Sequence, residues 1–420
     1  MITSECLRAC TGFKKAVAVI VTCALFLSAC ATPGTKGGGG FVVGPKLSSM
    51  FSKKEAVDPS TPRPRLDVII PVFDPGLPEN EKDYDNEGVW PELRRAEANR
   101  YALKLKDALE KTNKFGAVRV TPDKSATGDI YIMGRIEESD GEEVEIDLTL
   151  YDISGTRWFS KSFDHEVDSY FHENIRNKGK DPYDPVFEEA ATYIVEQLED
   201  FSASELSNLK AVTELRFGAS FSDGVFAQYL NFDGEKVTLI GLPSEDDPML
   251  ARIRAVRVRD QLFVDRLQGE YEAFNYSMND SYAIWQKESM FEVKAARKAN
   301  IKSAFEGITG ALLVGLAIAT AASNTEYGNY SPGKDVAAIG AGIGGVALLS
   351  NSFKTSKEAK VHKDALEELG KSMDIELAPK VVEFEKKTVE LTGDASEQFA
   401  QWRAFLKQVY LEEATPDLQL

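Results

Sequence analysis

Few residues of this 420-residue sequence combine a reactive type with a useful spacing. There are four cysteines, at positions 6, 10, 23 and 30, and three histidines. His165-Glu166 and His172-Glu173 lie two helical turns apart, so a helix would place both imidazoles on one face. However, the spacing is not that of the HExxH motif, and the segment follows a predicted strand. We therefore interpret both as surface histidines and predict no metal site.

Other catalytic or ligand-binding motifs are incomplete or absent from the sequence. Asp83, Asp85, Glu87 and Gly88 match only the first half of a calcium loop, because Arg94 stands where the bidentate glutamate belongs. The sequence contains no G-x-S-x-G motif, no phosphate-binding loop and no cysteine after position 30. We predict no cofactor and no enzymatic activity. A hydrolase that uses carboxylates at an unrecognised site is the alternative.

Cys30 is the one cysteine with a specific context. Residues 1–29 begin with a positively charged segment and continue with the apolar run Ala16–Leu27, as export signals do. The run ends in Leu27-Ser28-Ala29-Cys30, which resembles the lipobox of bacterial lipoproteins. The resemblance implies that the Cys30 thiol receives a diacylglycerol, that the chain is cut before Cys30, and that the new amine is acylated, for example with palmitate. An ordinary signal peptide with a chance cysteine, or a short membrane anchor, is the alternative.

The resemblance also predicts where the protein resides. Ala31 follows Cys30, where an aspartate would signal retention in the inner membrane. The expected location is therefore the outer membrane of a Gram-negative envelope, with the body facing the periplasm. The net charge of −18 disfavours nucleic acid as a partner, because phosphate binding needs clustered Lys and Arg. With 43% hydrophobic and 28% charged residues, the chain cannot be wholly disordered.

Composition divides the chain into successive regions. After the signal peptide 1–29, residues 30–64 contain the glycine run Gly37–Gly40 and read as a lipidated, flexible tether. We predict an α+β domain over 65–201, a connector over 202–245, a long-helix region over 246–412 and a tail over 413–420.

The predicted N-terminal domain has the element order β-α-β-β-β-β-α. Val144, Ile146, Leu148 and Leu150 alternate with polar residues, which is typical of a strand with one buried face. The predicted elements are strands over Leu66–Phe73, Ala117–Thr121, Asp129–Glu137, about 143–150 and Arg157–Phe163, and helices over Pro91–Lys114 and Pro185–Phe201.

Three segments of this domain carry a second, weaker resemblance. They are VIIPVF, GDIYIMGRI and DLTLYDISGTRWFSKSF, which lie between residues 68 and 163. They resemble the periplasmic domain of the curli-secretion lipoprotein family and the amino-terminal domain of the Tol-system propeller protein. The resemblance implies a non-catalytic domain that forms rings or docks envelope partners.

Helical patterns dominate the rest of the sequence. We predict a helix over Ser204–Phe217 and a hairpin at Asp233-Gly234. From Asp247 to Gly307, apolar residues recur at three- and four-residue steps, which predicts one long amphipathic helix or two abutting ones. Phe353–Gly370 and Val381–Tyr410 are predicted to supply further helices, with breaks at Pro379 and Gly393.

Residues 307–353 form the most unusual segment of the sequence. Gly307–Thr325 and Val336–Phe353 contain no charged residue and are separated by a polar turn. As helices, each would be nearly as long as the roughly 30 Å hydrocarbon core of a bilayer. Small residues recur every fourth position, a pattern that lets two helices approach closely. This stripe consists of Gly307, Ala311, Gly315, Ala319, Ala337, Ala341 and Gly345.

Three interpretations of this apolar hairpin stay open. It inserts into a membrane or joins other copies of the chain, it is buried in a soluble helical core, or it is a disordered Gly/Ala segment. We expect an outer-membrane lipoprotein that acts as a non-enzymatic assembly, scaffold or partner-regulating factor. Its expected partners are a membrane, through the lipid on Cys30, an envelope protein and a second copy through the hairpin. A ring-forming component of a secretion apparatus is the alternative.

Overall fold

The computed structural model describes residues 63–84, 89–305, 357–384 and 387–414. All of them belong to the larger of two compact units of the chain, Val57–Leu420. The predicted signal peptide, Cys30, the glycine-rich tether and the apolar hairpin 307–353 lie outside the described residues. Among the residues described, no helix is both long and apolar enough to span a membrane.

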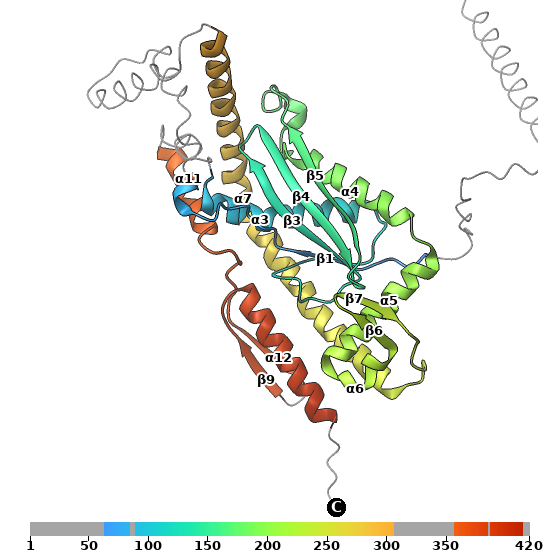
Figure 1. The fold of residues 1–420 in the computed structure, drawn as a ribbon. Helices are drawn as coiled ribbons and strands as arrows, with labels where there is room; N and C mark the ends of the chain where they lie inside the picture. The colour runs from blue at the N-terminus through green and yellow to red at the C-terminus, as the bar shows by residue number, and fades with distance from the viewer. Residues whose placement is uncertain (1–62, 85–88, 306–356, 385–386, 415–420) are drawn as a thin grey trace, which may run out of the picture. The chain divides into compact units, whose positions relative to one another are not determined.

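A five-stranded sheet forms the centre of the N-terminal part (Figure 1). Its strand order is β2-β1-β3-β4-β5, with β1 parallel to both β2 and β3 and with β3, β4 and β5 antiparallel. Helix α3, Pro91–Lys111, supplies the crossover that the parallel pair β1 and β2 requires. The strands are β1 (Val68–Pro71), β2 (Val118–Thr121), β3 (Ile130–Ser139), β4 (Glu143–Asp152) and β5 (Arg157–Glu166).

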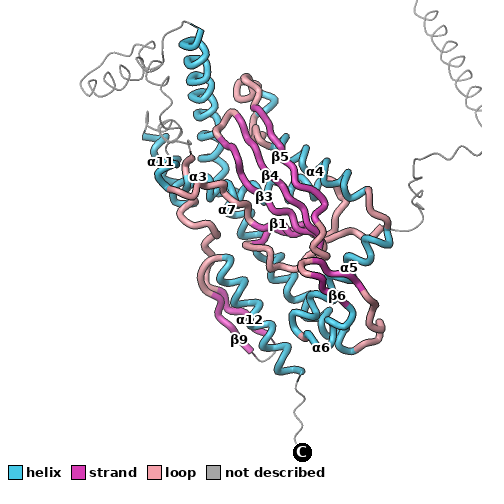
Figure 2. Tube along the Cα trace, viewed as in Figure 1, coloured by secondary structure: helices cyan, strands magenta, loops and turns pink. Residues whose placement is uncertain are grey.

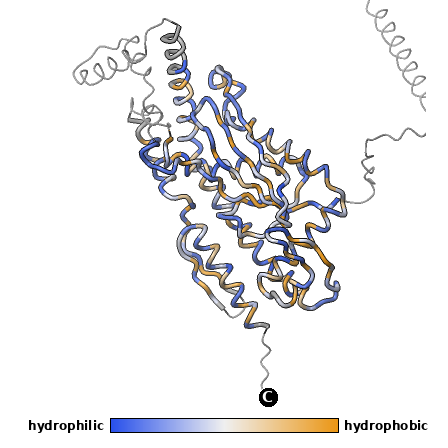
Figure 3. The backbone as a smooth tube through the Cα atoms, in the orientation of Figure 1, coloured by the Kyte–Doolittle hydropathy of each residue, from blue (hydrophilic) through white to orange (hydrophobic). Residues whose placement is uncertain are grey.

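One face of the sheet is buried and the other is polar. The predicted inward residues of β4, from Val144 to Leu150, are all buried, whereas the alternate residues are partly exposed. Helices α3 and α4 (Asp184–Glu199) cover the buried face, where the rings of Tyr101 and Phe187 meet at 5.2 Å. Figure 3 shows that the hairpin tip between β3 and β4 is hydrophilic. The predicted mixture of α and β structure is confirmed.

Helix α5 and a small hairpin follow the sheet. Helix α5, Ala203–Phe221, begins at Ser202, whose side chain and Glu205 form a reciprocal capping box. Strands β6 (Leu230–Asp233) and β7 (Lys236–Leu239) pair around Gly234, which adopts a positive φ of 61°. The predicted helix and hairpin of this region are confirmed.

Helix α7, Pro248–Phe305, is one continuous helix of 58 residues. Of the two alternatives predicted for this segment, one long helix or two abutting ones, the structure shows the first, and Gly269 does not interrupt it. Its buried residues include Phe263, Tyr271, Tyr282 and Trp285. It contacts β2, α3 and α5, and also α11 (Lys357–Leu369) and α12 (Ala395–Ala414).

The prediction of a helix over Val381–Tyr410 is wrong in its first part. Strands β8 (Lys380–Phe384) and β9 (Lys387–Leu391) form an antiparallel hairpin, and only α12 is helical (Figure 2). The β-branched residues Val381, Val382 and Val389 favour this outcome, because they lose side-chain freedom in a helix and pack well in strands. The apolar residues of this segment therefore serve a strand pair rather than a helix face.

Candidate functional site

A cleft of about 760 Å³ lies between α3, the loop 167–183 that joins β5 to α4, and the second half of α7. We refer to it as the α3–α7 cleft. Its walls come from Arg100 and Lys104 of α3, from residues 171–184 and from residues 279–287 of α7. It is the right size for a small organic ligand. The chain thus brings three segments that are far apart in sequence to one polar concavity.

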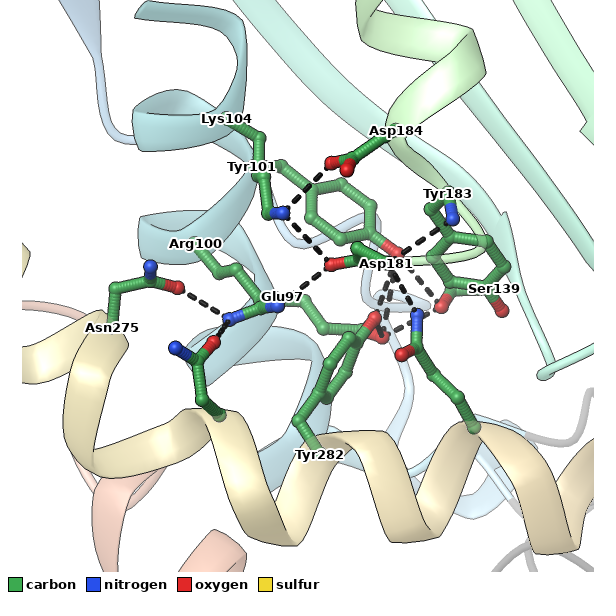
Figure 4. Close-up of polar contacts among 12 residues, drawn as sticks. Glu97, Arg100, Tyr101, Lys104, Ser139, Asp181, Tyr183, Asp184, Asn275 and Tyr282 are labelled. Carbon is green, nitrogen blue, oxygen red and sulfur yellow. Dashed lines mark hydrogen bonds and ion pairs between the residues drawn. The ribbon is translucent and has the colours of Figure 1, made fainter. Parts of the chain in front are cut away.

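Arg100 and Asp181 line the α3–α7 cleft, and Figure 4 shows the contact between them; we refer to this buried pair as the floor of the cleft. A guanidinium nitrogen of Arg100 lies 2.6 Å from Asp181 Oδ2, and both side chains are at most 6% exposed. The Arg100 guanidinium also donates to Asn279 Oδ1 at 2.6 Å and to Asn275 Oδ1, and it stacks over the Tyr282 ring. Arg100 therefore links α3 to the loop and to α7.

Asp181 gathers several donors around one carboxylate. Lys104 Nζ lies 3.1 Å from Asp181 Oδ2, while Gln286 Nε2 and the Tyr183 backbone N–H both donate to Oδ1 at 3.0 Å. Burial alone would raise the pKa of Asp181, but Arg100 and Lys104 outweigh burial and hold the pKa below its ordinary value. Asp181 is consequently ionised at neutral pH and acts as a fixed acceptor.

A second polar network lies beside the floor and centres on Glu97. Its carboxyl group is fully buried, and Oε1 accepts hydrogen bonds from Ser139 Oγ at 2.6 Å and from Tyr282 OH at 2.7 Å. Tyr101 OH shares hydrogen bonds with both Ser139 Oγ and Tyr282 OH. Burial raises the pKa of Glu97, and Arg94, 3.8 Å away, opposes that rise. This network ties α3 to β3 and to α7 inside the core.

The rest of the cleft lining differs from the floor because it contains basic side chains that are not ion-paired within the described chain. Lys178, Lys180 and Lys287 line it and form no ion pair with any described residue. His172 lines it too, and its buried Nε2 has no hydrogen-bond partner in the described part of the chain. Burial lowers the pKa of His172, as does the positive charge of Lys287. The imidazole is therefore neutral at physiological pH.

The two predicted surface histidines occupy different environments. His165 lies on β5 opposite Val144, and His172 lies in the loop at the cleft. Within the described ranges, no group of three or more His, Cys, Asp or Glu residues is arranged to hold a metal ion. The lipid-bearing Cys30 and the small-residue stripe from Gly307 to Gly345 lie outside those ranges.

Helices α7 and α11 flank the apolar hairpin and pack against each other. Ser281 Oγ of α7 shares a 3.0 Å hydrogen bond with His362 Nδ1 of α11. The end of α11 also meets α3, because Arg95 donates to the Gly370 carbonyl oxygen at 3.0 Å. A side chain at Gly370 would collide with the backbone of Glu92, which explains the glycine there. Helix α11 is thus held against both α7 and α3.

Near its C-terminal end, α7 also forms ion pairs with the β3–β4 turn. Arg297 lies 3.1 Å from Asp140 and 2.8 Å from Glu142, and it also pairs with Glu143. Lys294 donates to the Val167 carbonyl oxygen at 3.1 Å. These contacts hold α7 at Lys294 and Arg297 against the β3–β4 turn and the loop 167–183.

Sequence reasoning missed the Arg100–Asp181 pair and the Glu97 network. A usable signal existed in α3, where Arg94, Glu97 and Arg100 recur at three-residue steps beside the apolar face. Asp260 gave a similar signal, because it interrupts the apolar face of α7, and it pairs with Arg403 of α12 at 2.9 Å.

Comparisons with protein-family models, with curated proteins and with solved structures found no match to this chain.

Proposed function

We propose that this chain is a periplasm-facing lipoprotein of the outer membrane that acts as a non-enzymatic assembly, scaffold or partner-regulating factor. Two features of the sequence support the location. The segment Leu27-Ser28-Ala29-Cys30 has the form of a lipobox, and Ala31 lacks the aspartate of inner-membrane retention. Acyl chains on Cys30 would supply stable attachment, since more than one chain is needed for it.

The packing of α7 on α11 is the observation that carries the scaffold proposal. Besides the Ser281–His362 bond, Phe274 of α7 lines a small cavity together with Leu369 of α11. Position 274 precedes 281 whereas position 369 follows 362, so the two helices run antiparallel. The C-terminal end of α7 and the N-terminal end of α11 therefore point the same way. A hairpin over 307–353 would leave and re-enter the body on one side.

This arrangement suits a segment that is presented to a membrane or to another copy of the chain. In our proposal, 307–353 folds as two apolar helices whose small residues, including Gly315 and Ala341, let them pack closely. The α+β part, 65–201, would serve as the surface for an envelope partner. The resemblance to ring-forming and docking domains supports that role.

Carbonate extraction of membranes tests the proposal. Three proteins would be compared: the wild type, Cys30→Ala behind a cleavable non-lipoprotein signal, and wild type lacking 307–353. We expect the wild type and the deletion variant to sediment with the outer membrane. Intact-mass analysis should find acyl mass on Cys30. A wild-type chain that carbonate releases, or one without acyl mass, would refute the lipoprotein assignment.

The Cys30→Ala protein separates the two roles of the hairpin. If the processed Ala variant stays in the carbonate pellet, the hairpin is embedded in the membrane. If it becomes soluble, the mass of the detergent-extracted wild type decides whether the hairpin joins copies of the chain. An oligomer that the deletion of 307–353 reduces to a monomer would place the hairpin between copies, and a monomeric wild type would exclude that role and a ring.

A further inference from the structure

We propose that the α3–α7 cleft is a binding site for a phosphate group carried by a small organic ligand or by a lipid headgroup. The inference is independent of the anchor at Cys30 and of the apolar hairpin. It rests on the charge, the unpartnered donors and the dimensions of the cleft.

The charge of the cleft contrasts with that of the chain. The protein as a whole carries a net charge of −18, so free cations gathered in one concavity need a reason. Lys178 and Lys180 lie in the loop, and Lys287 lies across from them on α7. None of the three has an ion-pair partner among the described residues. By contrast, Lys104 is occupied, because it pairs with Asp181 and Asp184.

Carboxylates also line the cleft, and they have to be counted against the lysines. Asp181 and Asp184 are satisfied by Arg100 and Lys104. Glu173 and Asp280 remain, so three lysines and two carboxylates of the lining have no ion-pair partner among the residues that the structure describes. The lining of the cleft therefore has a net positive charge when the residues that pair with each other are left out of the count.

Two buried nitrogen atoms of the lining residues lack a hydrogen-bond partner among the described residues. Arg100 is only 4% exposed and lines the cleft, yet its Nε lacks a hydrogen-bond partner within the described chain. His172 Nε2 is likewise buried and without a partner there. A buried donor without an acceptor costs free energy, and a bound oxyanion would satisfy it. The rigid floor holds Arg100 in place before any ligand arrives, which reduces the cost of binding.

The apolar residues of the lining indicate what the rest of the ligand is, besides its phosphate group. Phe171 and Ile284 line the cleft, and Ile175 lines it while being 86% exposed. A volume of about 760 Å³ exceeds the needs of a lone phosphate ion. The ligand class is thus a phosphate ester with an apolar or glycerol-like part, either free in solution or displayed by a lipid.

Calorimetry on the full mature chain in a non-ionic detergent tests the site. The probes are inorganic phosphate, glycerol 3-phosphate, and mixed micelles with either phosphatidylglycerol or phosphatidylcholine. We expect saturable binding of glycerol 3-phosphate that is tighter than that of inorganic phosphate. Binding of phosphatidylglycerol micelles as well would identify the lipid as a source, whereas binding of the soluble ester alone would identify a solute. No saturable binding of any phosphate probe would overturn the proposal.

Matched variants separate a defined site from general charge attraction. Lys178→Ala/Lys180→Ala should weaken binding about tenfold, because the variant loses two cations that attract the phosphate; a tenfold change corresponds to about 1.4 kcal/mol. Lys407→Ala is the control, because Lys407 is an exposed lysine on α12, away from the lining of the cleft. An equal effect of both variants would overturn the proposal. Unchanged thermal unfolding of each variant would confirm that the fold is intact.

Discussion

Gln268 of α7 binds the backbone of Val120 as a neighbouring strand would. Its Oε1 accepts from the Val120 N–H at 2.9 Å, and its Nε2 donates to the Val120 carbonyl oxygen at 2.8 Å. Val120 lies in β2, which is an edge strand of the five-stranded sheet. Edge strands expose unpaired backbone groups that can pair with other chains. The long helix therefore protects this edge with a side chain instead of a strand.

Gln268→Leu should lower the free energy of unfolding by about 1–3 kcal/mol, because the buried backbone of Val120 loses both partners. Urea titration of the variant and the wild type measures the change. Gln408→Ala on the exposed face of α12 is the matched control and should stay within about 0.5 kcal/mol. Identical unfolding midpoints for both variants would contradict the role of Gln268.

Tyr282→Phe tests the network around Glu97. The substitution removes the 2.7 Å hydrogen bond to a fully buried carboxyl group but keeps the ring. A loss of about 1–3 kcal/mol in unfolding free energy is expected. Tyr276→Phe is the control on the same helix, since Tyr276 is 81% exposed. If the two variants have the same stability, the network does not hold α7 to α3.

Arg100→Met tests the floor of the cleft. It leaves Asp181 buried without its closest cation, so the free energy of unfolding should fall by about 3–5 kcal/mol. The double variant Arg100→Met/Asp181→Asn should recover part of that loss, because no unpaired charge remains. Thermal and urea unfolding of the two single variants and the double variant form a double-mutant cycle. Strictly additive effects would mean that the pair is not coupled.

We expect Asp374→Asn to raise the stability of the folded chain in a pH-dependent way. Burial, with Asp394, Asp123 and Glu397 nearby, raises the pKa of Asp374 to about 6. The folded state then binds this proton more tightly than the unfolded state, whose carboxyl has a pKa of about 3.9. Stability from this group therefore falls as pH rises from about 4 through 6.

The variant should match the wild type near pH 4 and exceed it at pH 7.5. The gain should be at most about 1 kcal/mol, because partial exposure screens the repulsion. Urea titrations at both pH values measure it. Asp364→Asn, on the exposed face of α11, should change little at either pH. A loss of stability for Asp374→Asn at pH 7.5 would contradict the assigned repulsion.

Local patterns predicted most elements of the sheet and the long helix. Alternation from Val144 to Leu150 identifies a strand with one buried face, and the three- and four-residue steps through Phe263 and Tyr282 identify an amphipathic helix. Such patterns are sufficient to predict a strand or a helix, because each element must bury its apolar face whichever other element it packs against. They failed at Val381–Leu391, where apolar residues fit a helix and a short hairpin about equally well.

The sequence by itself predicted most of the elements and their order along the chain, and it is the basis of the lipobox prediction at Cys30. Only the tertiary structure decided the partners of the buried polar residues. Arg100 meets Asp181 across 81 positions, and Gln268 meets Val120 across 148. The spacing of residues along the sequence does not predict such pairs. A charged or amide side chain can bond to any suitable group that the fold brings within hydrogen-bond distance. The α3–α7 cleft exists for the same reason, since its walls come from three segments that only packing brings together.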